Sequence, residues 1–167
     1  MDSQNHIVEK MCGFYADKTH LATMLFPYLN KKLQEGEKVE TLFNDGMEEN
    51  ANKLVKNLNI NSELEKEFKD IKWNKTKKSE IEKEMNGIIN KHTKITILVN
   101  GTEDKIEKTN QVLNLWIDNN MEKLEGKKIK LINFYEITDY NSLGEILEKY
   151  SKVVNTSGEH NIKEIFC

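Results

Sequence analysis

The chain has 167 residues, of which 37% are hydrophobic and 32% are charged, and its formal net charge is −3. This length suits one domain whose core is large enough to be stable without disulfide bonds or bound metal ions. The apolar runs are far shorter than the roughly 20 residues of a membrane-spanning helix, and no basic segment followed by an apolar stretch opens the chain. We therefore expect a single cytoplasmic domain over residues 1–167, with no membrane partner.

All 25 basic residues are lysine, so the sequence contains no arginine. Arginine is the side chain that most often grips phosphate groups and guanine edges through two hydrogen bonds. Its absence and the negative net charge argue against sequence-specific DNA recognition. We expect no nucleic-acid partner.

The first half of the chain alternates apolar runs with helical periodicity. A strand is predicted over 7–15, and a helix over 18–35 follows, in which Pro27 should produce a kink or mark a helix start. The next elements are a strand over 39–43, a helix over 47–58 and a short or edge strand within 59–76.

The second half continues the same alternation. Helices are predicted over 79–91, 102–122 and 142–150, and strands over 95–99 and 128–135. Two short strands, at 153–154 and 162–166, should be joined around Gly158.

Strands that alternate with helices predict a mainly parallel sheet with helices on both faces. We therefore predict a three-layer α/β/α domain of the RecA or Rossmann type. No helix separates the last two strands, so they should form an antiparallel edge.

Familiar catalytic and metal-binding motifs are missing from the sequence. There is no GxxxxGK[ST] loop and no GxGxxG after a strand, and both are signatures of nucleotide binding. Cys12 reads as a buried core thiol and Cys167 as a loose terminal thiol. No metal-ligand spacing relates the four histidines, which are His6, His20, His92 and His160. We expect no cofactor and no metal site.

Neutral hydrogen-bonding side chains follow the predicted strands. Ligands of open α/β sheets bind outside the carboxyl ends of the strands, where this sequence places Tyr15, Asn44, Asn100 and Tyr135. These four residues are our predicted ligand-binding site, suited to a small, largely apolar molecule. In the alternative interpretation, the asparagines serve turns and the tyrosines pack.

Two parts of the sequence resemble a known family. The stretch from His6 to Tyr15, with Leu25-Phe26-Pro27-Tyr28-Leu29 and the segment Leu33 to Val39, resembles the opening of the MEDS domain. Leu131 to Glu136, Leu143 to Leu147 and Val153-Val154 resemble its closing strand, helix and strand. The resemblance implies a RecA-like fold without phosphate-loop chemistry. It also implies a sensory role in prokaryotic signalling, with small organic ligands.

The resulting functional prediction is a non-catalytic sensory domain that binds a small organic molecule. It would act through a regulatory partner protein or a homo-oligomer. A second hypothesis is a protein–protein interaction module derived from a RecA-like ATPase, without ligand or hydrolysis. A third is an enzyme whose site is assembled from Cys12, a histidine and an acidic residue.

Overall fold

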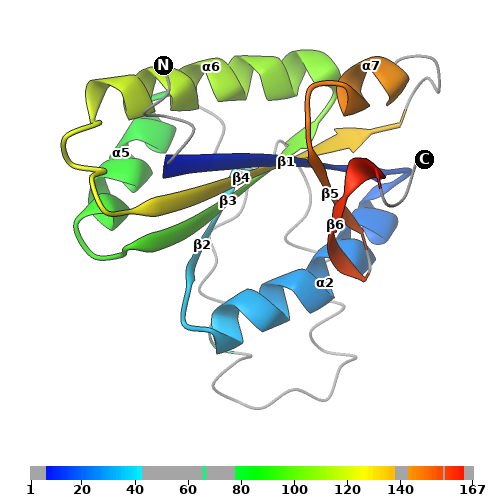
Figure 1. Ribbon diagram of the computed structural model, residues 1–167, viewed down its shortest axis with the longest axis horizontal. Helices are drawn as coiled ribbons and strands as arrows, with labels where there is room; N and C mark the ends of the chain where they lie inside the picture. The colour runs from blue at the N-terminus through cyan, green and yellow to red at the C-terminus, as the bar shows by residue number, and fades with distance from the viewer. Residues whose placement is uncertain (1–6, 43–65, 67–77, 138–142, 156, 164–167) are drawn as a thin grey trace.

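One six-stranded sheet with helices on both faces forms the centre of the molecule (Figure 1). The computed structural model describes residues 7–42, 66, 78–137, 143–155 and 157–163. The predicted α/β class with a mainly parallel sheet is confirmed. Its elements are β1 (Val8–Tyr15), α2 (Lys18–Gln34), β2 (Lys38–Leu42), α5 (Lys78–Ile89), β3 (Lys94–Gly101), α6 (Glu103–Asn119), β4 (Lys128–Glu136), α7 (Leu143–Leu147), β5 (Lys152–Asn155) and β6 (Gly158–Asn161).

Most element predictions agree with the structure to within a few residues, although α7 is shorter than the predicted helix over 142–150. Pro27 lies inside α2, which runs through it as one helix of 17 residues. The predictions over 47–58 and 59–76 lie outside the described residues.

The last strand is a correction, because β6 spans Gly158–Asn161 and residues 162 and 163 are not in a strand, while 164–166 lie outside the described residues. The physical reason is a tight turn between β5 and β6. The Asn155 side-chain oxygen accepts hydrogen bonds from the backbone N–H of Ser157, at 2.9 Å, and from its hydroxyl, at 2.7 Å. Gly158 then takes a positive φ of 106°, which favours glycine. The predicted antiparallel pairing is confirmed, since β5 and β6 pair in that way.

The strand order is β2-β3-β4-β1-β5-β6, and every neighbouring pair except β5–β6 is parallel. The chain therefore leaves β1 for the far edge at β2, returns through β3 to β4, and then passes β1 to reach β5. The connections after β1 and β4 lead in opposite directions. This makes the carboxyl ends of β1 and β4 the topological switch point of the sheet.

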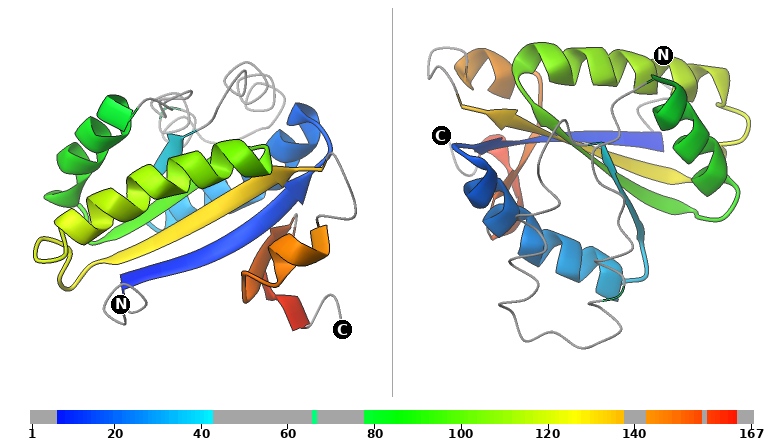
Figure 2. Two further views of the ribbon diagram at one scale, coloured as in Figure 1. Left: turned by 90° about the horizontal axis from the view of Figure 1, so that it is seen from above. Right: turned by 180° about the vertical axis from the view of Figure 1, so that it is seen from behind.

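Two hydrophobic clusters pack against the sheet, one on each face. Residues of α2 pack on one face, here called the α2 face, while α5, α6 and α7 pack on the other, the α6 face (Figure 2). Gly13 of β1 lies on the α2 face, where a Cβ would come within 2.6 Å of the Phe134 ring. The two hydrophobic clusters, one on each face of the sheet, together form the core.

Candidate functional site

A small cavity lies at the switch point, at the carboxyl ends of β1, β3 and β4. Its volume is about 120 Å³. It is lined by Tyr15, Asp17, Lys18, Asn100, Gly101, Thr102, Lys105 and Glu136. Because open α/β sheets bind ligands at this position, we take this crevice as the candidate site.

Tyr15 and Asn100, two of the predicted site residues, meet in the crevice. The side-chain amide of Asn100 donates a hydrogen bond of 3.3 Å to the Tyr15 hydroxyl. Both side chains are buried, with 4% and 3% of their surfaces exposed. Tyr15 is the last residue of β1 and Asn100 is the second-last residue of β3, and they lie on the same face of the sheet although β4 lies between those strands. Asn44, a third predicted residue, lies outside the described residues.

A two-residue connection joins β1 to α2 at the edge of the crevice. The backbone N–H of Ala16 donates to Nδ1 of His20 at 2.9 Å, and the N–H of His20 donates to the Asp17 carboxylate at 2.8 Å. These bonds occupy two backbone N–H groups that would otherwise be available to an anion at the start of α2. A phosphate group at this position would have to displace them.

Charged side chains complete the rim of the crevice. Thr102 caps α6, since its side chain accepts from the backbone N–H of Lys105. Lys105 and Glu136 are exposed and form no ion pair within the described part of the chain. The lining is therefore more polar than the largely apolar site that the sequence suggested.

Tyr135, the fourth predicted residue, points to the opposite face of the sheet. Along β4 the neighbouring residue Glu136 lies on the crevice side, and successive side chains of a strand alternate between faces. The Tyr135 hydroxyl hydrogen-bonds the Tyr150 hydroxyl at 2.7 Å on the α6 face. Tyr135 thus belongs to a different polar cluster.

That cluster is a closed network of neutral side chains under α6. Asn133 of β4 is fully buried and exchanges two amide hydrogen bonds with Asn110 of α6, at 2.9 and 3.1 Å. Its side-chain N–H also donates to Tyr150 at 2.9 Å. We call Asn110, Asn133, Tyr135 and Tyr150 the buried network. An asparagine between the apolar residues Ile132 and Phe134 was the sequence signal for it.

Burial keeps the ionisable groups near this network in their neutral forms. It raises the pKa of the Cys12 thiol to about 12. Burial is also the largest cause of the raised pKa of Tyr135, followed by the hydrogen bond with Tyr150. Among the described residues, the polar contact of the Cys12 sulfur is the Lys152 carbonyl, at 3.8 Å, and no histidine contacts it. His6 and Cys167 lie outside the described residues.

The described residues contain no group of three or more histidine, cysteine or acidic side chains placed to hold a metal ion. None of their helices combines the length and the apolar character needed to cross a membrane.

No family model matches this chain, and no curated protein matches it either. The resemblance to the MEDS domain therefore stays a prediction.

Proposed function

We propose that this protein is a non-catalytic sensory domain that binds a small polar molecule in the crevice at the switch point. Binding would alter its contacts with a regulatory partner protein or within a homo-oligomer. The observation that carries the proposal is the buried Tyr15–Asn100 hydrogen bond in a cavity at the ligand-binding edge of an open α/β sheet.

The size and charge of the crevice favour a small zwitterion, such as an amino acid. Its volume of about 120 Å³ is well below the roughly 300 to 1,000 Å³ of drug-sized sites, so the crevice suits only a compact molecule. Lys105 offers a cation to a carboxylate, and Glu136 offers an anion to an ammonium group. Asn100 and Tyr15 would fix the orientation of the ligand through neutral hydrogen bonds.

The local chemistry supports a binding role over a catalytic one. The Ala16 amide and the first turn of α2 are engaged by His20 and Asp17. The buried Cys12 thiol stays protonated, because its pKa is raised to about 12, and a protonated thiol is a poor nucleophile. These contacts favour a ligand that is held rather than transformed.

The crevice also offers a route for a signal. Asp17 immediately precedes α2 and Thr102 immediately precedes α6, and both residues line the cavity. The two helices pack on opposite faces of the sheet. A ligand that contacts both helix starts would bias the positions of both outer layers together.

The test is calorimetric titration of the intact chain with glycine, serine and β-alanine. We expect at least one to bind, with affinity reduced about tenfold or more in Lys105→Glu, because charge reversal repels the carboxylate. Lys123→Glu, another exposed lysine away from the crevice, is the control and should bind as the parent does. Asn100→Ala should also weaken binding, if its melting temperature shows that it folds.

Two outcomes would refute this proposal. One is that none of the three amino acids binds the parent protein, and the other is that Lys105→Glu binds as tightly as Lys123→Glu. A native mass spectrum that shows a protein complex but no bound small molecule would instead support the interaction module without a ligand.

A further inference from the structure

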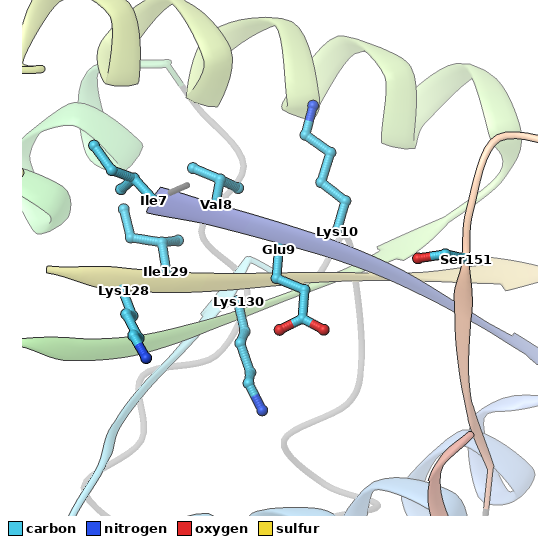
Figure 3. Close-up of a pocket in the computed structure, with 8 residues that line it drawn as sticks. All are labelled: Ile7, Val8, Glu9, Lys10, Lys128, Ile129, Lys130 and Ser151. Atoms are coloured by element: carbon cyan, nitrogen blue, oxygen red, sulfur yellow. The ribbon is translucent and has the colours of Figure 1, made fainter. Parts of the chain in front are cut away.

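The amino half of the α2 face is polar, in contrast to its carboxyl half. In that half, Glu9, Lys130 and Thr96 stand side by side on β1, β4 and β3, with Lys128 and Lys94 one row nearer the strand starts. The row nearer the carboxyl ends is apolar: Met11, Ile132 and Leu98 belong to the core cluster. Figure 3 shows Glu9, Lys128 and Lys130 on one side of the sheet and Lys10 on the other.

A hollow of about 250 Å³ lies over this polar half and is lined by Glu9, Glu37, Lys94, Ile95, Thr96, Lys128 and Lys130. We call this hollow the amino-end groove. It shares Glu9, Lys128 and Lys130 with a second hollow of about 440 Å³, which Lys94 does not line.

Each carboxylate in and beside the groove already has a lysine partner. Three ion pairs account for them: Glu9 with Lys152 at 2.6 Å, Glu37 with Lys32 at 3.4 Å, and Glu159 with Lys130 at 3.0 Å. The acidic side chains of the groove are therefore neutralised from within the protein.

Lys94 and Lys128 remain as a surplus of positive charge. Both are exposed, and neither forms an ion pair with any residue the structure describes. They are register partners on the parallel strands β3 and β4, which lie about 4.8 Å apart. Like charges directly opposite each other on neighbouring strands are destabilising. An anion bound between the two ammonium groups would attract both of them and so offset their repulsion.

We infer that the amino-end groove binds a small phosphate-bearing anion between Lys94 and Lys128. Lysine ammonium groups bind phosphate as point charges. Lys130, whose charge is paired with Glu159, borders the same hollow. The volume of this hollow, about 250 Å³, favours a compact anion over a long polyanion. This site is at the opposite edge of the sheet from the crevice and does not depend on the proposed function.

The test is the melting temperature in phosphate against chloride at matched ionic strength. A ligand at ten times its dissociation constant should raise the melting temperature of a chain of this size by about 4 °C. We expect this rise in the parent protein and its loss in Lys94→Gln/Lys128→Gln. In chloride, the double variant should melt no lower than the parent, because the repulsion is gone.

The controls separate a built site from a general salt effect. Lys123→Gln should keep the full rise in phosphate. The single variants Lys94→Gln and Lys128→Gln, each at an exposed position, should each lose part of it. The inference is overturned if the parent shows no rise in phosphate, if the double variant keeps it, or if a short single-stranded RNA gives a larger rise than phosphate does.

Discussion

The two faces of the sheet each carry a polar cluster, and the clusters differ in charge and in access to water. The buried network on the α6 face is neutral, and its amide and hydroxyl groups bond to one another. The amino-end groove on the α2 face is charged and open, and two of its lysines carry no ion pair within the described residues. The buried network therefore stabilises the fold, while the amino-end groove still has charged side chains that can bind a ligand.

Physical chemistry explains why the two clusters lie where they do. A neutral side chain can be buried if its hydrogen bonds are satisfied, as they are for Asn133. An unpaired charge cannot be buried at comparable cost, so it remains at a hollow that water reaches. Asn133 thus has its partners inside the protein, while Lys94 and Lys128 have no ion pair within the described residues.

The largest expected effect comes from breaking the buried network. Asn133→Ala removes one side-chain hydrogen-bond partner each from Asn110 and Tyr150 inside the fold, and we expect the free energy of unfolding to fall by about 3 kcal/mol. Urea denaturation measures this change. Asn114→Ala removes only a 3.3 Å bond to exposed Lys10 and should cost less than about 0.5 kcal/mol. Equal losses in the two variants would contradict the structural role of the network.

A second test uses the pH dependence of stability at Cys12, which lies beside the network on the α6 face. Its pKa is raised from 9.0 to about 12 in the folded protein, so the unfolded chain releases the proton first as pH rises. Stability should fall above pH 9, by about 1.4 kcal/mol per pH unit until pH 12.

Urea denaturation at pH 8 and pH 10 isolates this contribution. The parent should lose about 1.4 kcal/mol more than Cys12→Ala over that range. Lysines and tyrosines titrate in both proteins, so their effects cancel in the difference. Parallel losses in the two proteins would show that the thiol ionises as readily in the fold as outside it.

The smallest expected effect concerns the Lys130–Glu159 pair beside the groove. Burial alone would raise the pKa of Glu159, but the hydrogen bond and charge of Lys130 outweigh burial, and the net shift is downward. The stabilisation from this carboxylate is therefore present above the ordinary glutamate pKa and is lost as pH falls.

Thermal or urea denaturation between pH 6 and pH 3.5 checks this sign. The parent should lose about 0.5 kcal/mol more than Glu159→Gln, as expected for a partly exposed pair. Glu107→Gln, at an exposed position on α6, should follow the parent. If the parent protein instead gained stability relative to Glu159→Gln as the pH falls, the downward shift of the Glu159 pKa would be wrong.

Much of the fold followed from local patterns. The alternation of apolar runs with helical periodicity predicted the α/β class, and the absence of a helix after residues 153–154 predicted the antiparallel edge. The burial of Cys12 was likewise predicted from its apolar neighbours and is confirmed. The end of the chain was less predictable, because the turn bonds of Asn155 and Ser157 set where β6 begins.

The candidate site shows what the sequence by itself determined and what only the tertiary structure decided. The sequence determined that polar side chains follow the strands at Tyr15, Asn100 and Tyr135. Strand order and register decided which of them meet, because a shift of one residue moves a side chain to the other face of a sheet. Tyr15 and Asn100 therefore share the crevice, while Tyr135 bonds to Tyr150 on the far face. The side-by-side placement of Lys94 and Lys128 likewise depends on register between strands more than 30 residues apart in the chain.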